Sequence, residues 1–238
     1  LTEIAKNVIG PLGYVVQKYI ENPLIILNRK FDIRQWALIT DLYPLTIWLW
    51  QNPYLRFSAE DYDPNDFGNT FSHLTNNSVA KHSYHFKETP IVDNMWFIEQ
   101  FREYLTEYYG KDYWPEIQEK IGKIVTYSVA CCKHKILDRK NCFELFGYDF
   151  MVDQFLNVYL IEINASPDWT YSTHVTEDLV KKCSEDIVRV TVDYADNLKK
   201  KPQERKEIDT GLLKQIYCSN EFPKFEGKIN KEKRMKIK

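Results

Sequence analysis

Residues 144–164 contain two apolar segments joined by a short polar turn, a pattern that predicts a β-hairpin. Three side chains with hard oxygen ligands lie on it: Asp149, Glu162 and Asn164. Glu162 and Asn164 share one face of the second strand, and Asp149 is placed to meet them across the hairpin. Oxygen ligands without Cys or His favour Mg²⁺ over zinc. The alternative interpretation is that water solvates these polar side chains at a strand edge.

The composition indicates a folded domain with a substantial core. The chain has 238 residues, of which 44% are hydrophobic and 15% aromatic. It has no apolar run approaching the roughly 20 residues of a membrane helix and no signal-peptide pattern. Its five cysteines show no C-x-x-C spacing, which favours reduced thiols and a cytosolic location. Because the chain opens on Leu1 in the middle of a pattern, we expect it to be part of a longer protein.

The charge distribution suggests a division of the chain near residue 198. Residues 199–238 carry 13 Lys and Arg against six Asp and Glu, whereas the rest of the chain is acidic. The basic segment lacks clear periodicity, so we predict a domain over 1–198 and a flexible tail over 199–238.

The order of the predicted elements favours an α+β fold, with an antiparallel sheet and flanking helices. Short apolar segments bounded by turns predict five strands, at 14–20, 24–27, 31–40, 45–50 and 54–57. A long polar segment follows over 58–94 and is expected to be functional or mobile. Apolar residues at spacings of three and four predict three helices, at 95–109, 114–134 and 175–198.

One predicted strand carries three charged residues on a single face. Lys30, Asp32 and Arg34 alternate with Phe31 and Ile33. Burying three charged side chains is costly unless they bind a ligand. A nucleotide is one possibility, in which Asp32 would accept hydrogen bonds from ribose hydroxyls and Lys30 and Arg34 would contact phosphates. The alternative is an exposed face with local charge pairs. The chain has no P-loop sequence, so side chains and a metal would have to hold any phosphate.

Two further segments carry weaker signals. Residues 17–20 lie at the end of a predicted strand, where unpaired backbone groups can hydrogen-bond an adenine. Residues 73–78, in the polar segment, are rich in hydroxyls and amides, which suit either a helix cap or a polar substrate. Taken alone, the second segment favours the cap.

Together these segments resemble the tubulin tyrosine ligase-like family, a branch of the ATP-grasp ligases. The motifs occur in the family's order: QKYI at 17–20, KFDIR at 30–34, HLTN at 73–76, FGYDF at 146–150 and LIEIN at 160–164. The resemblance covers about residues 14–198. The segments that look most like the tubulin glycylases are 34–36, 40–41, 44–48 and 162–167, with 172–173 and 175–176.

The resemblance implies the C-terminal part of an ATP-grasp fold and a role for each motif residue. Arg34 would be the catalytic residue, stabilising the transferred phosphoryl group and the acyl-phosphate. The residues implied to bind ATP are Gln17, Lys18, Tyr19, Ile20, Lys30, Asp32, Thr75 and Asn76. Arg56, Asn77 and Ser78 would lie beside the incoming amino acid, and Asp149, Glu162 and Asn164 would hold Mg²⁺.

The implied activity is ATP-dependent ligation of free glycine to glutamate side chains in tubulin tails, through an acyl-phosphate. The implied partners are tubulin and microtubules, without nucleic acid or membrane, and the implied enzyme is a monomer of the cytoplasm, cytoskeleton and cilium. The family also has N-terminal segments that would precede Leu1, so we expect this piece alone to be inactive. Two alternatives stay open: a ligase for glutamate or tyrosine, and a non-catalytic microtubule-binding protein with the same fold.

Overall fold

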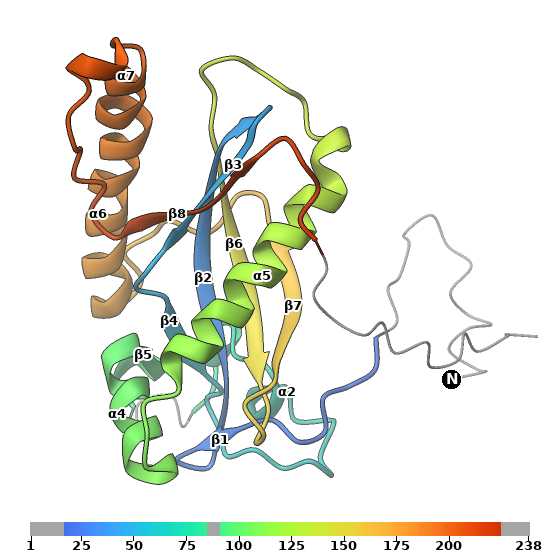
Figure 1. Cartoon of the computed structure of the whole chain (residues 1–238). Coiled ribbons are helices and arrows are strands. Elements are labelled where there is room, and N and C mark those ends of the chain that lie inside the picture. Colours follow the sequence, from blue (N-terminus) through green and yellow to red (C-terminus); the bar gives the residue numbers. More distant parts are fainter. Residues whose placement is uncertain (1–16, 85–90, 225–238) are drawn as a thin grey trace, which may run out of the picture.

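A computed structural model describes residues 17–84 and 91–224 of the chain. The fold is mixed α+β, with one eight-stranded sheet and helices packed against it (Figure 1). The strands are β1 (Ile25–Ile26), β2 (Arg29–Leu42), β3 (Leu45–Trp50), β4 (Tyr54–Phe57), β5 (Met95–Phe97), β6 (Glu144–Val152), β7 (Val158–Asn164) and β8 (Leu213–Ser219). The α-helices are α2 (Thr70–His73), α3 (Asn77–Ala80), α4 (Ile98–Tyr109), α5 (Trp114–Cys132), α6 (His174–Val188) and α7 (Ala195–Leu198).

Strand β2 is the centre of the sheet and determines its register. It pairs antiparallel with β3 and β4 on one side and with β6 on the other. Strand β7 continues the sheet beyond β6, and β8 and β5 continue it beyond β3 and β4. The long strand β2 therefore connects the predicted charged face to the hairpin of β6 and β7.

The two faces of the sheet bury different apolar clusters. The first cluster includes Phe31, Ile33 and Phe150 and packs under α4 and α5. The second includes Trp36 and Leu38 and packs under α6, through Val175 and Leu179. Figure 1 shows α5 lying across the sheet and α6 standing beside it. Successive β2 residues point to opposite faces, so one strand contributes to both clusters.

Most of the predicted elements are confirmed. Strands β1 to β4 lie within or close to the predicted ranges, and residues 144–164 form the β6–β7 hairpin. Thr173 caps α6, because its hydroxyl accepts from the backbone N–H of Thr176. A six-residue π-helical segment, Arg189–Tyr194, connects α6 to α7 within the predicted helix 175–198. No helix in the described part of the chain is long and apolar enough to span a membrane.

Two predicted elements are corrected. Residues 95–97 form strand β5 rather than the start of a helix, because this aromatic segment pairs with β4 and places Trp96 against Phe57. Residues 17–20 are not a strand, and residues 14–16 of that prediction lie outside the described residues. In this segment the Tyr19 side chain, rather than a backbone ladder, makes the contacts described below.

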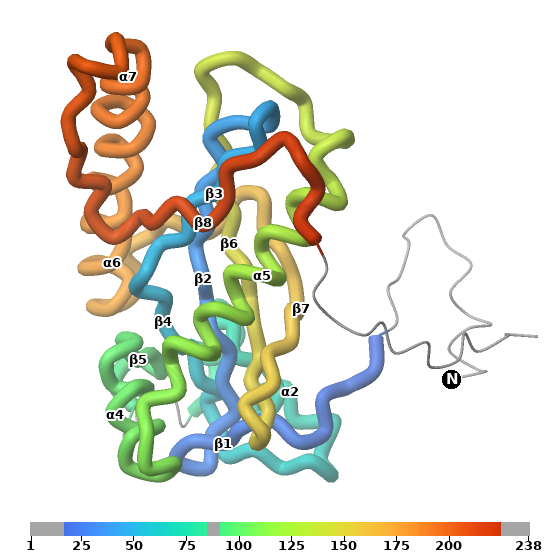
Figure 2. Tube along the Cα trace, in the orientation of Figure 1, coloured from blue at the N-terminus to red at the C-terminus, as the bar shows by residue number. Residues whose placement is uncertain are grey.

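The segment predicted as a flexible tail contains strand β8. Strand β8 crosses beside β3 (Figure 2). Residues 213–219 pair antiparallel with β3, and Leu213 is fully buried. The backbone N–H of Leu212 also donates to Asp186 of α6. Lys214 and Gln215 interrupt the short apolar pattern of this strand in the sequence. Residues 225–238 of the predicted tail lie outside the described residues, and the domain division at residue 198 stays a prediction.

Candidate active site

The charged face of β2 faces residues of opposite charge on both neighbouring strands. Asp32 is opposite Arg56 of β4, and Arg34 is opposite Asp149 of β6. Lys30, Asp32, Arg34, Arg56 and Asp149 are all at least 93% buried. The sequence alternation is therefore confirmed, and the register of three strands gathers these charges into one cluster.

The arginines and aspartates of this cluster form a connected ion-pair network. Arg56 donates from Nε to Asp32 Oδ1 at 3.0 Å and from Nη2 to Asp32 Oδ2. The same Nη2 lies 2.8 Å from Asp149 Oδ2. Arg34 Nε lies 2.6 Å from Asp149 Oδ1, and its Nη2 donates to Oδ2 at 3.3 Å. Asp149 thus lies between two guanidinium groups, which offsets the cost of burying its charge.

The predicted metal ligands meet across the β6–β7 hairpin. Asp149 is opposite Glu162, and Asn164 is opposite Gly147. Asn164 Nδ2 donates to Glu162 Oε1 at 3.1 Å. Asp149 Oδ1 is buried and accepts no hydrogen bond of normal geometry, despite its ion pair with Arg34. Two facing carboxylates, an amide and an unsatisfied buried oxygen form a donor set that fits a hard divalent cation.

This donor set contains only two carboxylates. Within residues 17–84 and 91–224, no group of three or more His, Cys, Asp and Glu side chains is placed to hold a metal ion. A site on this hairpin therefore needs the amide of Asn164 as well as Asp149 and Glu162.

The environment shifts the acidity of three groups in different directions. Burial raises the pKa of Asp149 to about 6, although the charges of Arg56 and Arg34 act in the opposite direction. The hydrogen bond that Asn164 donates, with a smaller effect of hydrogen bonding with Asp149, lowers the pKa of Glu162. Burial lowers the pKa of Lys30, against the attraction of Asp32. A divalent cation at the hairpin would favour the ionised forms of both carboxylates.

Tyr19 connects Lys30 to the HLTN segment. Lys30 Nζ donates to the Tyr19 hydroxyl at 3.2 Å, and that hydroxyl lies 2.7 Å from His73 Nδ1. His73 Nε2 lies 3.0 Å from the carbonyl oxygen of Asp66, and the His73 ring stacks on Phe67. Residues far apart in sequence therefore meet at one end of β2.

The other residues of segment 17–20 lie further from the cluster. Gln17 and Lys18 are exposed and Ile20 is half-buried. Lys18 pairs with Glu21 at 3.5 Å. Among the four residues predicted to contact adenine, Tyr19 is therefore the one that hydrogen-bonds Lys30.

The remaining predicted residues lie at α3. Thr75 is buried, and Asn76 occupies the N-cap position without a side-chain capping bond. The cap favoured by the sequence is made instead by Asn69 at α2. Asn77 Oδ1 is buried without a hydrogen-bond partner, and Ser78 is exposed. Within the described residues, Arg56 pairs with Asp32 and Asp149 rather than with this segment.

Sequence reasoning missed two neighbours of Arg34. A Cβ atom placed on Gly147 would lie 2.6 Å from Arg34 Nη1 and 2.8 Å from Pro167 Cβ. Glycine is therefore required where the guanidinium group and the proline approach β6. The glycine of FGYDF was a signal in the sequence, but Pro167 comes close only because the chain folds back after β7.

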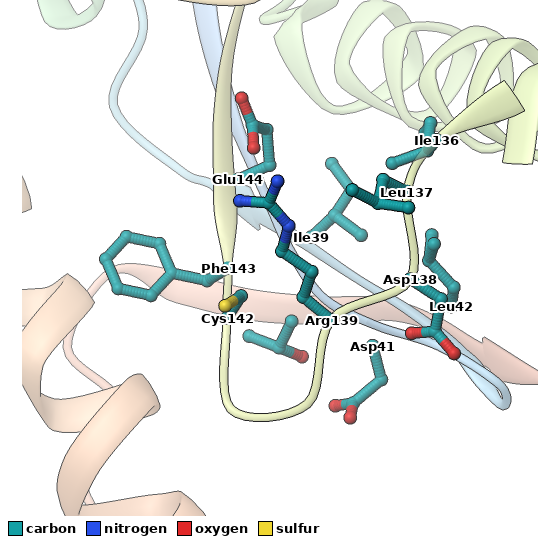
Figure 3. Close-up of a pocket in the computed structure, with 11 residues that line it drawn as sticks. Ile39, Asp41, Leu42, Ile136, Leu137, Asp138, Arg139, Cys142, Phe143 and Glu144 are labelled. Carbon is teal, nitrogen blue, oxygen red and sulfur yellow. The ribbon is translucent and has the colours of Figure 1, made fainter.

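Cavities in the described part of the chain also lie away from the charged cluster. One of about 420 Å³ lies at the opposite end of β2, between residues 39–42 and the segment 136–144 (Figure 3). A second, of about 510 Å³, shares Thr40, Asp41, Cys142 and Phe143 with it and extends to α7. None of the predicted site residues lines either cavity.

The comparisons with known proteins identify the family. Residues 3–200 match the Tubulin-tyrosine ligase family. This chain belongs to the tubulin-tyrosine ligase family. It is 49% identical to Tubulin glycylase 3C of Tetrahymena thermophila over 86% of its own length, and 36% identical to human Tubulin monoglycylase TTLL3 over 90%. It is 40% identical to Protein monoglycylase TTLL8 of Mus musculus over 76%.

This tubulin-tyrosine ligase family chain is much shorter than those relatives. It spans 19%, 27% and 22% of their respective lengths. Its fold agrees with the predicted family fold, an antiparallel sheet with flanking helices.

Proposed function

We propose that this chain carries part of the active site of an ATP-dependent ligase that attaches glycine to glutamate side chains in tubulin tails. The buried network of Asp32, Arg34, Arg56 and Asp149 carries the proposal, together with the glycylase names of its relatives. A purely structural sheet gains little from burying four charges, because apolar side chains fill the same space at lower cost.

The nucleotide would lie over the N-terminal half of β2. Lys30 would contact phosphate oxygens in place of its hydrogen bond to Tyr19, and Asp32 would face the ribose or the metal-bound phosphates. The remaining proposed contacts to ATP are Gln17, Lys18, Tyr19, Ile20, Thr75 and Asn76. The hydrogen bonds from Lys30 to Tyr19 and from Tyr19 to His73 support this grouping.

Mg²⁺ would be held by Asp149, Glu162 and Asn164. When bound, it would neutralise the charge that develops on the phosphate oxygens. Arg34, already beside Asp149, would direct its guanidinium group to the transferred phosphoryl group and the acyl-phosphate. Arg56, Asn77 and Ser78 would lie beside the amino acid, and the unpaired Asn77 Oδ1 suits an ammonium group there.

The proposed reaction has two steps. A carboxylate oxygen of the tubulin tail attacks the γ-phosphorus of ATP, and ADP leaves. The amine nitrogen of glycine then attacks the acyl carbon, phosphate leaves and the amine loses a proton, which gives an isopeptide bond. The residues of this chain position the reactants and stabilise the developing charge, and none of them forms a covalent bond to the substrate.

The proposed partners are acidic tubulin tails, microtubules and free glycine, and the proposed enzyme acts as a monomer. Its proposed location is the cytoskeleton of the cytoplasm and cilium. The relatives named as glycylases support the substrate and the location.

Labelled glycine tests this proposal directly. The full-length protein would be incubated with microtubules and Mg-ATP, beside Glu162→Gln and the matched control Glu144→Gln, an exposed glutamate on the same hairpin. We expect incorporation by the parent and by Glu144→Gln, and at least a roughly hundredfold loss in Glu162→Gln. Labelled glutamate runs in parallel. Transfer of glutamate alone would indicate a glutamate ligase, and microtubule binding without transfer would indicate a non-catalytic protein.

A further inference from the structure

A chain of hydrogen bonds leads from Lys30 into the HLTN segment, and its donors and acceptors can be assigned. Lys30 Nζ lies 3.2 Å from the Tyr19 hydroxyl oxygen, which lies 2.7 Å from His73 Nδ1. His73 Nε2 lies 3.0 Å from the backbone oxygen of Asp66. An ammonium group only donates and a carbonyl oxygen only accepts, so the two ends fix the direction of the chain.

This direction makes His73 the acceptor for Tyr19. His73 Nε2 carries the hydrogen that is donated to Asp66, so Nδ1 of the neutral ring accepts, a tautomer assigned from these partners. The Tyr19 O–H therefore donates to Nδ1, and the lone pairs of its oxygen face Lys30. Without an acceptor at Nδ1, the hydroxyl could rotate and point its hydrogen at the ammonium group.

Aromatic rings hold His73 in this orientation. Its ring stacks on Phe67 at a centroid distance of 5.4 Å and an interplanar angle of 12°. Tyr62 and Tyr19 meet the ring edge-on, at centroid distances of 5.4 and 5.9 Å. Burial, with a smaller effect from Tyr62, raises the pKa of Tyr19, so its hydroxyl keeps the hydrogen that it donates. The position of His73 Nδ1 is therefore fixed by packing as well as by hydrogen bonds.

The competing partner for Lys30 is Asp32. It lies two residues further along β2 on the same face, and its charge attracts Lys30. The carboxylate of Asp32 already accepts from Arg56. A carboxylate holds an ammonium group more strongly than a neutral hydroxyl does. The oriented Tyr19 oxygen thus keeps Lys30 on an acceptor that it can leave readily for a phosphate.

We propose that His73 is a positioning residue for nucleotide binding, which orients the Tyr19 hydroxyl so that Tyr19 holds Lys30 ready for the phosphates of ATP. This inference rests on the proposed function, because it assumes that the phosphates lie at Lys30. The effect of His73 passes through Tyr19 and not through a contact with the nucleotide. Residues from three separate segments of the chain therefore act as one unit.

The nucleotide affinity of the full-length protein tests this role without the transfer reaction. Calorimetric titration with Mg²⁺ and the non-hydrolysable analogue β,γ-imido-ATP would compare the parent with Tyr19→Phe, which keeps the ring and removes the hydroxyl. We expect the affinity to fall about tenfold, the effect of one lost hydrogen bond to a charged group. His73→Leu, which leaves the Tyr19 hydroxyl without its acceptor, should lower the affinity about fivefold.

Two comparisons separate positioning from a general disturbance of the segment. His73→Asn places an acceptor oxygen close to the position of Nδ1 and should restore the affinity to within about twofold of the parent. His73→Leu combined with Tyr19→Phe should bind no more weakly than Tyr19→Phe alone, because His73 has nothing left to orient. The control is His82→Leu, an exposed histidine beyond α3, which should bind like the parent.

The outcomes distinguish this inference from the proposed function. A further loss when His73→Leu is added to Tyr19→Phe would overturn the positioning role, as would unchanged affinity in both single variants. A parent that does not bind the analogue would overturn the inference and the proposed function together. A parent that binds it but transfers glutamate would overturn the glycine ligase alone. If His73→Leu does not fold, His73→Gln replaces it, because the longer amide reaches the Asp66 carbonyl.

Discussion

One face of β2 has two halves that are equally buried and chemically opposite. The first half carries Lys30, Asp32 and Arg34, and the second carries Trp36 and Leu38. The exposed fraction is 7% for Arg34 and 1% for Trp36, two residues later. The charged half faces arginine and aspartate on neighbouring strands, and the apolar half lies under α6.

The comparison shows that burial alone does not reveal what a side chain does. The apolar half stabilises the fold through the surface it removes from water. In the charged half, attraction between the ions only offsets the cost of desolvating them, so its net contribution to stability is small. The second half is therefore scaffold, whereas the first half carries residues of the proposed active site.

The largest effect is expected in the apolar half. Trp36→Ala removes a side chain that contacts Trp50, Tyr54 and Trp169, and should lower the free energy of unfolding by about 4 kcal/mol. Urea denaturation followed by tryptophan fluorescence measures this loss. A change below about 1 kcal/mol would contradict the assignment of this half as scaffold.

Breaking the charged half from one side should have the next largest effect. Arg56→Ala leaves Asp32 and part of Asp149 buried without their partner, and should destabilise the fold by about 3 kcal/mol. The double variant Arg56→Leu with Asp32→Leu should recover most of that stability while the ligase activity stays absent. If the double variant is as unstable as the single one, the ion pairs themselves stabilise the sheet, and the instability of Arg56→Ala is not due only to an unpaired buried charge.

Gly147 and Gly122 form a matched pair for a smaller effect. Gly147→Ala forces a methyl group against Arg34 and Pro167 and should cost about 2 kcal/mol. Gly122 lies within α5, and a Cβ there has no neighbour closer than 3.9 Å, so Gly122→Ala should stabilise the helix by up to about 1 kcal/mol. Thermal unfolding should show a lower melting temperature for Gly147→Ala and a higher one for Gly122→Ala. A stabilising Gly147→Ala would show that the space between Gly147, Arg34 and Pro167 is not filled.

Cys183 tests the packing of α6 without a change in sequence. Burial, with a smaller effect from Asp186, raises the pKa of the Cys183 thiol above its ordinary value of 9.0. The thiol therefore favours folding below about pH 9, and this contribution is lost as the pH rises further. At pH 8, a maleimide should label the exposed Cys131, Cys132, Cys142 and Cys218 and leave Cys183 unlabelled, as mass spectrometry would show. Rapid labelling of Cys183 would mean that α6 opens readily from the sheet.

Local patterns in the sequence were enough for the core of the fold and the main motifs. Alternation placed Lys30, Asp32 and Arg34 on one face, and the apolar hairpin placed Asp149 opposite Glu162. These predictions succeeded because a strand has a fixed period of two and a short turn fixes the pairing of its two strands. The order of the family motifs along the chain then indicated that these residues belong to one site.

Other features required the tertiary structure, because they depend on contacts between distant segments. The sequence did not pair Arg56 with both Asp32 and Asp149, add β8 to the edge of β3 or bring Pro167 against Gly147. It predicted a strand over 14–20, but the described residues of that range, 17–20, form no strand, and the Tyr19 side chain makes the contacts there. Sequence by itself thus determined which residues share a face, whereas only the packing of strands and loops decided which charges pair and how much space the site leaves.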